Sequence, residues 1–575
     1  MRSSPVWRWM HGLIVAVTGA IVLCQGNAVV AQDMRLTKKL IATGWDHPDT
    51  ARLRENLALM EQRPFDGVVL DAIGRTGDGT NVGLRGAFQS QPWQRDWFQN
   101  CVDDLKACRS QRLSNNFVTV GANPGNVDWF DDAGWEQVVD HWRIAAWIAK
   151  EGGVKGILFD PEPYTEPFSQ FRYGAQSERD KHTFKEYHAK ARARGRQVMG
   201  AIAGEYPEIT LFCYFMNIVN RTATGHADPR RMLATVGYGL YSPFIDGWLD
   251  VAPPTVKLVD GCERAYRYNS VTEYLESALQ IKGVCQELVS PENRGKYRAQ
   301  VQVSFGMYLD AYWNPETSPW HIDGLGGPRV DRLRANTSTA LRVADEYVWV
   351  YGEQFRWWPT PNGRVKPETW PEALPGSEAA LRFARDPVDY ARTTLARLEK
   401  EEKLVNLTRN GDFGSDKAPT NQGPAEDWKE GGAPAGWHTW QTQDSHGTFA
   451  WDRERGRVAK GAARAAGVSS GCFIQSCEVK PGERYAVRAF ARRQGKSATS
   501  IRIRWQAGDG KWIAEAREVM VLFEAPEGDD PWEAALGVAE VPEGVGKLVV
   551  LLGVADQPSA EDAALFDDVD LYRLE

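Results

Sequence analysis

Short apolar runs in the first 400 residues of this 575-residue chain end in carboxylic acids or aromatic residues. The clearest case runs from Lys155 to Glu162 (KGILFDPE) and ends in Asp160 and Glu162. In an extended strand, residues at i and i+2 point to the same side, so these two carboxyl groups should lie close together. Crowding raises the pKa of one carboxyl group, and a carboxyl that stays protonated near neutral pH can act as a general acid.

Acids at the ends of three of these runs are the candidates for catalysis. They are Glu162, Asp160, Asp260, Glu263 and Asp310. The candidates for substrate binding, which are mainly aromatic, are Trp45, Asp46, His47, Tyr164, Trp313, Glu353, Trp357 and Trp358. Cleavage of a glycosidic bond needs this combination, because one carboxyl group protonates the leaving oxygen, a second one flanks the bond, and aromatic faces stack on sugar rings. A strand-end acid can also cap a helix or pair with a loop arginine. Each of these acids can therefore have a structural role in place of a catalytic one.

The run that ends in Glu162 resembles the Asp-Gly-x-Asp-x-Asp-x-Glu strand of chitinase-like and endo-N-acetylglucosaminidase families. The resemblance implies that Glu162 is the general acid and that Asp160 orients the acetamido group of the substrate, which acts as the nucleophile. Lys155 and Leu158 stand where those families have Asp, so the match is confined to the final Asp-x-Glu.

Two other kinds of glycosidase barrel assign the same acids differently. As in retaining α-glycosidase barrels, Asp160 would be the nucleophile and Asp260 or Glu263 the acid. As in many β-glycosidase barrels, Glu162 would be the acid/base and Asp310 the nucleophile, although the Asn that usually precedes that Glu is missing. The distance between the two carboxyl groups decides between retention and inversion, and the three assignments stay open at this point.

Eight such runs alternate with segments of helical periodicity in residues 35–400. The predicted strands are 38–44, 65–72, 116–122, 154–162, 209–217, 255–263, 300–310 and 347–353. Alternating strands and helices favour a parallel sheet, and eight repeats over this length predict a TIM (β/α)8 barrel. In that fold, the loops after the strands carry the reacting groups, so the candidate residues should gather at one end of the barrel.

Residues 404–575 show a different pattern, in which short alternating runs lie between Gly, Pro and Asp residues. This pattern predicts an all-β sandwich of the jelly-roll, galactose-binding-like type. The segments 406–413 (NLTRNGDF), 435–437 (AGW) and 565–569 (LFDDV) resemble those of CenC-type carbohydrate-binding modules. The resemblance covers nearly the whole of this part of the chain.

A CenC-type module implies glycan binding and, in many members, a structural calcium ion. Trp437 and Trp440 are the candidates for stacking on sugar rings. The oxygen ligands of the calcium would come from Asp412, Asp567 and Asp568. Gly414 stands where the family usually has Glu. No cofactor is expected for catalysis itself, because no His-Glu-x-x-His motif, Walker loop or dinucleotide-binding glycine motif follows a strand.

Residues 1–31 have the features of a cleaved signal peptide: basic residues, an apolar run from Leu13 to Leu23, and small residues up to Ala31. Leu23 stands where a lipoprotein signal needs a small residue before Cys24, so we expect no lipidation. No later run approaches the roughly 20 apolar residues of a membrane span. We therefore expect a secreted, periplasmic or cell-surface protein.

The net charge of −8, from 68 Lys and Arg against 76 Asp and Glu, provides no basic field for phosphates, so nucleic acid is not an expected partner. The sequence predicts a secreted glycoside hydrolase that cleaves a polysaccharide or glycan by carboxylic acid/base catalysis, with a C-terminal carbohydrate-binding module. The alternatives are a catalytically inactive glycan-binding surface protein, and a polysaccharide lyase or transglycosylase on the same barrel.

Overall fold

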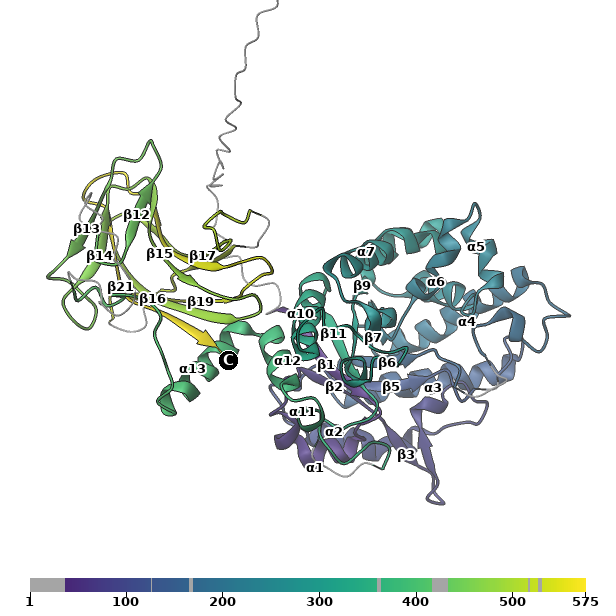
Figure 1. Ribbon diagram of the computed structural model, residues 1–575. Coiled ribbons are helices and arrows are strands. Elements are labelled where there is room, and N and C mark those ends of the chain that lie inside the picture. Colours follow the sequence, from purple (N-terminus) through teal and green to yellow (C-terminus); the bar gives the residue numbers. More distant parts are fainter. Residues whose placement is uncertain are drawn as a thin grey trace, which may run out of the picture.

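The protein folds into two parts that follow one another along the chain (Figure 1). The computed structural model describes residues 37–125, 127–164, 169–358, 363–415, 433–514, 518–525 and 530–574. The first part contains a nine-stranded parallel sheet surrounded by helices, and the second contains two five-stranded antiparallel sheets. The predicted signal peptide, residues 1–31, lies outside the described residues.

The parallel sheet has the strand order β10-β11-β1-β2-β5-β6-β7-β8-β9. Its strands are β1 (Lys39–Gly44), β2 (Gly67–Leu70), β5 (Phe117–Gly121), β6 (Gly156–Asp160), β7 (Thr210–Cys213), β8 (Lys257–Asp260), β9 (Val301–Val303), β10 (Gly306–Tyr308) and β11 (Tyr347–Gly352). Each of the eight predicted strand segments contains a strand of this sheet, and the segment 300–310 contains two. Most of the strand residues are buried, as expected of apolar, β-branched runs that are covered on both faces.

The two edge strands of this sheet are neighbours in the sequence. β9 pairs with β8, β10 pairs with β11, and only Ser304 and Phe305 separate β9 from β10. The Ser304 amide donates to the carbonyl of Asp260 at 2.9 Å, and the Phe305 carbonyl accepts from the Trp349 amide at 3.1 Å. The sheet is therefore curled, so that the carboxyl ends of its strands converge on one region.

Helices connect the strands and cover the outside of the curled sheet (Figure 1). They are α1 (Thr50–Met60), α2 (Gln99–Ala107), α3 (Asp132–Glu151), α4 (Phe184–Glu205), α5 (Pro229–Met232), α6 (Tyr241–Val251), α7 (Val271–Lys282), α8 (Arg294–Gln300), α9 (Leu309–Trp313), α10 (Arg329–Val343), α11 (Trp370–Ala373), α12 (Ser377–Arg385) and α13 (Pro387–Lys400), and β3 (Ile73–Arg75) and β4 (Asn81–Gly83) form a hairpin. Local sequence sets their starts: Thr183 and Glu186, for example, form a capping box at α4. None of the described helices has the length and apolarity needed to cross a membrane.

Much of the tryptophan in the first part lies in its core. Trp135 and Trp142 of α3 and Trp248 of α6 are buried, and they pack around Phe88 and Phe159. The rings of Trp142 and Phe159 meet edge to face, with centroids 5.0 Å apart. Large rings bury large apolar areas, so these tryptophans serve packing and not ligand binding.

The second part consists of two antiparallel sheets that share one core. One has the order β12 (His438–Gln441), β15 (Ser470–Glu478), β20 (Lys547–Ala555), β17 (Ala498–Gln506) and β18 (Val519–Leu522), and the other the order β13 (Thr448–Asp452), β14 (Ala462–Ala466), β21 (Ala563–Leu574), β16 (Arg484–Gln494) and β19 (Glu533–Glu540). Phe473 and Trp505 from the first sheet and Phe566 from the second belong to the same buried cluster. The boundaries of the two predicted domains, 35–400 and 404–575, stay predictions.

The two parts contact each other through the last helices of the first part. Phe383 of α12 and Tyr390 of α13 form a buried cluster with Leu574 at the end of β21. The guanidinium of Arg334 on α10, itself buried, lies 2.7 Å from the carboxylate of Glu540 at the end of β19. Apolar contact and a shielded ion pair therefore join the two parts.

Candidate active site

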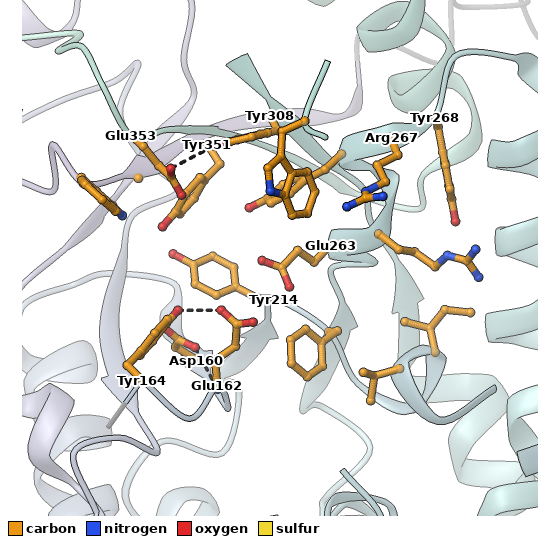
Figure 2. A pocket seen from close by; sticks show the side chains of 18 of the residues that line it. Asp160, Glu162, Tyr164, Tyr214, Glu263, Arg267, Tyr268, Tyr308, Tyr351 and Glu353 are labelled. Carbon is orange, nitrogen blue, oxygen red and sulfur yellow. Dashed lines mark hydrogen bonds between the residues drawn. The ribbon is translucent and has the colours of Figure 1, made fainter. Parts of the chain in front are cut away.

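A cavity of about 910 Å³ opens where the strands of the curled sheet end (Figure 2). The predicted site residues that line it are Trp45, His47, Asp160, Glu162, Tyr164, Glu263 and Glu353. They come from the carboxyl ends of β1, β6, β8 and β11, or from the loops directly after them. Ligands of α/β proteins bind at this end of parallel strands, because the loops there are free to carry polar groups. The cavity is therefore the candidate active site.

Asp160 and Glu162 share one hydrogen-bond partner, Tyr164 (Figure 2). The Tyr164 hydroxyl lies 2.9 Å from Asp160 Oδ2 and 2.7 Å from Glu162 Oε2. The Glu162 amide also donates to Asp160 Oδ1, at 3.1 Å. A tyrosine hydroxyl carries a single proton, so it donates to one of the two carboxyl groups and must accept from the other. The arrangement therefore holds the two acids side by side, and both contacts are full hydrogen bonds when one of the acids carries a proton.

The surroundings of these acids raise their pKa values. Burial and the charge of Glu162 raise the pKa of Asp160 to about 6, against the opposing charge of Arg85. Burial also raises the pKa of Glu162. Burial and repulsion from the other cavity acids raise the pKa of Glu263 to about 9. Carboxylates this close cannot all ionise away from water, so the cluster keeps at least one proton near neutral pH.

Asp160 and Glu162 differ in their access to a ligand. Asp160 is only 2% exposed, and its Oδ2 lies 3.8 Å from Nη1 of Arg85. Glu162 is half-buried and lies further along the loop. Glu162 is therefore the better-placed proton donor, and Asp160 is the better-shielded negative charge.

Asp310, predicted for catalysis, holds a loop instead. It is buried and does not line the cavity. Its carboxylate accepts from the amides of Glu353 at 2.8 Å and Gln354 at 3.2 Å. The Glu353 carboxylate in turn accepts from the Tyr308 hydroxyl at 2.9 Å. Because a buried amide without a partner is costly, Asp310 fixes the segment that places Glu353 in the cavity.

Asp260, the other acid predicted for catalysis that lies outside the cavity, has a similar role. It is fully buried, and it accepts from the amides of Ile218 at 3.1 Å and Cys262 at 3.3 Å. Burial raises the pKa of Asp260 to about 6. These bonds position two 3-10 helices beside the cavity, η5 (Asn217–Gly225) and η7 (Glu263–Arg267). Asp260 and Asp310 therefore support the loops around the cavity and do not line it, and their part in catalysis stays a prediction.

His47 lines the cavity, but both of its ring nitrogens have protein partners. Nδ1 lies 2.8 Å from Nη2 of Arg85, which is itself paired with Asp71 at 3.1 Å. Nε2 lies 2.7 Å from the Thr43 hydroxyl, which is 2.8 Å from the Tyr214 hydroxyl. Burial lowers the pKa of His47, and an arginine nitrogen only donates, so the ring is neutral. His47 therefore positions the Tyr214 hydroxyl and is not free to bind substrate through its nitrogens.

Aromatic rings form much of the remaining wall of the cavity. Tyr266 and Tyr308 stack with ring centroids 4.9 Å apart and an interplanar angle of 24°. Tyr214 stacks on the buried Trp349 at 4.6 Å. Trp45, which is 50% exposed, also lines the cavity. Flat rings with polar edges suit the C–H faces and hydroxyl groups of sugars.

Four residues predicted for substrate binding do not line the cavity. They are Asp46, Trp313, Trp357 and Trp358. Asp46 is buried and accepts from the Trp357 amide at 3.1 Å. The rings of Trp357 and Trp358 are buried against Phe65, and Trp313 packs against another aromatic ring. Asp46, Trp357 and Trp358 are buried and Trp313 is half-buried, so none of the four faces the cavity, and their contact with substrate stays a prediction.

Apart from Tyr164, the sequence analysis missed the tyrosines that line the cavity, and it missed the arginines. Tyr214, Tyr308 and Tyr351 lie at strand ends, where the same rule that selected the acids would have found them. The missed arginines are Arg85, Arg221, Arg264, Arg267 and Arg364. They lie in loops and 3-10 helices, where no periodic pattern marks a residue as pointing toward the strand ends.

Trp437 and Trp440, predicted to bind glycan in the second part, have different surroundings. Trp437 is 2% exposed, and its indole N–H donates to the Asn410 carbonyl at 3.2 Å, so it belongs to the core. Trp440 lies on the edge strand β12 and is 54% exposed. Trp512, beyond the end of β17, is 47% exposed and lies under the guanidinium of Arg504 at 4.4 Å.

The three predicted calcium ligands are engaged with other groups. The Arg457 amide donates to Asp567 Oδ2 at 2.6 Å, and the Arg457 guanidinium lies 2.7 Å from Asp568 Oδ2. Asp412 accepts from the Gly414 amide at 3.3 Å. In the described ranges, no three or more His, Cys, Asp and Glu side chains are grouped so as to hold a metal ion. Protein groups contact all three carboxylates in this arrangement, and the calcium site stays a prediction.

Comparison with protein families and with curated proteins gives no match for this chain. Solved structures similar to parts of it include carbohydrate-binding modules and a phage tailspike domain. A CBM22-1 xylan-binding domain from Paenibacillus barcinonensis is 16% identical, with a TM-score of 0.19, over 25% of this chain and 89% of the domain. A CBM61 module in complex with β-1,4-galactotriose is 15% identical, with a TM-score of 0.20, over 29% of this chain and 99% of the module.

The enzymatically active domain of tailspike protein 4 from bacteriophage CBA120 is 16% identical, with a TM-score of 0.21, over 30% of this chain. The chain spans 22% of the length of that tailspike chain. At TM-scores this low, none of the three similarities establishes a fold or an activity for this protein.

Proposed function

We propose that the cavity is the active site of a glycoside hydrolase that cleaves a polysaccharide or glycan. The observation that carries the proposal is the Tyr164 hydroxyl shared between Asp160 and Glu162, because it joins two acids whose pKa values are raised by burial in a cavity lined by aromatic rings. We also propose that the curled sheet is a closed (β/α)8 barrel. This is supported by β9 and β10, which bring its two edges within two residues of each other.

Glu162 is the proton donor in this proposal. Its raised pKa keeps the proton available, and it protonates the glycosidic oxygen as the bond to the anomeric carbon breaks. The positive charge that develops on the anomeric carbon needs a second group. On an N-acetylated sugar, the acetamido oxygen of the substrate attacks the anomeric carbon while Asp160 orients it, and water then opens the cyclic intermediate to complete hydrolysis. On other sugars, Glu353 is the carboxylate that the cavity offers for this role, because Glu263 keeps its proton near neutral pH.

The test is product release from neutral, acidic and N-acetylated glycans by the protein and by Glu162→Gln. The substitution keeps the size of the side chain and removes its titratable proton. We expect turnover of one glycan class to fall at least about 100-fold, the usual contribution of a general acid. The loss should be much smaller on a dinitrophenyl glycoside of the same sugar, because that leaving group needs no proton. Glu151→Gln, an exposed glutamate at the end of α3, is the matched control and should leave turnover unchanged.

Other results would reassign the chemistry. Turnover that survives in Glu162→Gln and is lost in Glu263→Gln would make Glu263 the acid. Unsaturated or lengthened products would indicate a lyase or a transglycosylase. Glycan binding without turnover by the unmodified protein would contradict the hydrolase and favour a catalytically inactive glycan-binding protein.

We further propose that the second part is a β-sandwich carbohydrate-binding module that holds the enzyme on its polymer through Trp440. The exposed indole of Trp440 supports this role, since a flat ring open to solvent can stack on a sugar. Attachment of the two parts raises the local concentration of substrate at the cavity. Export directed by residues 1–31 completes the proposal, and an exported protein that begins near residue 32 would support it.

A further inference from the structure

Three arginines line the cavity on the side formed by η5 and η7. They are Arg221, Arg264 and Arg267. Figure 2 shows Arg267 and the neighbouring Tyr268 on the far side of Glu263 from Asp160 and Tyr164. The cavity therefore has an acidic side, where we place bond cleavage, and a basic side.

The basic side lacks carboxylate partners. Among the described residues, no side-chain hydrogen bond or ion pair is formed by Arg221, Arg264 or Arg267, whereas Arg85 in the same cavity is paired with Asp71. The nearby carboxylate of Glu273 is used by the start of α7, where it accepts from the amides of two residues at 2.9 Å.

Aromatic rings hold two of these guanidinium groups in place. The Arg267 guanidinium lies 4.2 Å from the ring centroid of Trp320, and that of Arg264 lies 5.8 Å from the centroid of Tyr268. Stacking on a ring fixes the plane of a guanidinium but leaves its N–H donors unused. Arg221 is half-buried beside them, and burial together with the charge of Arg264 lowers its pKa. Guanidinium groups that repel each other and whose N–H groups lack hydrogen-bond acceptors are stabilised when an anion binds between them.

We propose that Arg221, Arg264 and Arg267 bind an anionic group of the substrate, a carboxylate or a sulfate, so that the enzyme acts on an acidic glycan. Both groups present oxygen pairs that match the donor fork of arginine. The acids on the opposite side of the cavity repel the same group, so the two sides together orient the sugar. This inference rests on the proposed function for the reaction, but the anion site can be tested by binding alone.

The experiment measures the affinity of Glu162→Gln for matched pairs of oligosaccharides. One pair is an oligo-uronate and its carboxyl-reduced form, and the other is a sulfated galactan oligosaccharide and its desulfated form. We expect the anionic member of one pair to bind at least about 10-fold more tightly, because hydrogen bonds to charged groups are strong. Its affinity should also fall as salt concentration rises. The pair that shows the preference identifies carboxylate or sulfate as the group bound.

Arginine variants then locate the site. Arg264→Gln and the double variant Arg221→Gln/Arg264→Gln should lose about 10-fold or more of the affinity for the anionic member and none for its neutral form. Arg264→Lys, which keeps the charge, should lose less of this affinity. It also tests the anion site if the double variant does not fold. Arg112→Gln is the matched control, because Arg112 is an exposed arginine in the loop that enters β5 from the opposite end of the sheet.

The outcomes separate this inference from the proposed function. Equal affinity for charged and neutral members, or variants that bind as tightly as the control, would overturn the anion site. If neutral glycans are hydrolysed without preference for charge, the hydrolase stands and the anion site fails. If acidic glycans bind through the arginines and are not cleaved by the unmodified protein, the anion site stands and the hydrolase fails.

Discussion

The cavity and the outer face of the β12–β18 sheet both present aromatic rings, but their charged groups have different surroundings. In the cavity, Asp160 and Glu263 are shielded from water, and their pKa values are raised. On the outer face, Trp440 is exposed, and Arg502 pairs with Glu518 at 2.6 Å near the surface. Shielding from water raises the pKa values of acids toward or above neutral pH, whereas the exposed face offers only a surface for stacking. Aromatic content alone therefore does not separate a reactive site from a binding face.

The strongest test of this difference is Asp160→Asn. We expect turnover to fall at least about 100-fold, as for a group that takes part in acid–base catalysis, because the negative charge of Asp160 beside Glu162 is lost. The melting temperature should change little, since an amide can still accept from the Glu162 amide and contact Tyr164. Asp310→Asn is the matched control. Its NH2 group would face one of the two backbone N–H groups that the carboxylate now accepts from, and that N–H group would lose its acceptor. The free energy of unfolding should therefore fall by about 1–3 kcal/mol. Equal activity loss in both variants, with equal destabilisation, would contradict distinct roles for the two acids.

The second test concerns the two tryptophans of the C-terminal part. Trp437→Ala should lower the free energy of unfolding by about 3–5 kcal/mol, because it empties a buried site in the core between the sheets. Trp440→Ala should change it by less than about 0.5 kcal/mol, as expected for an exposed side chain. Chemical denaturation of both variants measures the difference. Similar destabilisation by the two substitutions would mean that Trp440 is also a packing residue.

The third test uses the shielding of Glu263. Its pKa is raised from 4.5 to about 9, so the folded protein keeps a proton that the unfolded chain releases above about pH 4.5. The folded state is therefore increasingly penalised as pH rises from about 4.5 to about 9. Glu263→Gln removes this penalty, and we expect it to stabilise the protein by about 1–3 kcal/mol at pH 8 and hardly at all at pH 4. Melting temperatures across this range provide the measurement, and a shift that is independent of pH would argue against the raised pKa.

The smallest expected effect is on binding by the outer face. Trp440→Ala in the full chain should weaken adsorption to an insoluble polymer about 5- to 10-fold, the loss expected when an aromatic stacking contact is removed. Turnover of a short soluble substrate should stay unchanged, because the cavity is intact. Depletion of protein by the polymer and release of soluble product are measured side by side. Unchanged adsorption would remove Trp440 from the binding face.

The rule that reactive groups follow strand ends located most of the acids of the cavity but could not separate them from their neighbours. Asp260 is the last residue of β8 and Glu263 follows it closely, yet only Glu263 lines the cavity. Asp260 turns toward backbone amides of two loops, and no pattern in the sequence states which amides need an acceptor. Likewise, Trp45 and Trp358 both follow strands, and the first is half exposed while the second is buried. Side-chain direction at a strand end depends on neighbours that are far away in the sequence.

The sequence by itself determined where the strands and helices of the first part run and where the Asp-x-Glu at the end of β6 stands. It also determined the change along the chain from alternating strands and helices to strands alone. These features follow from alternation, helical periodicity and local spacing, which any short segment carries. Only the tertiary structure decided that Asp310 supports Glu353, that Arg85 faces Asp160, and that three arginines face the acids across one cavity. The physical reason is that shielding from water and hydrogen-bond partners come from segments that meet only after folding, and those two effects set the charge state of each acid.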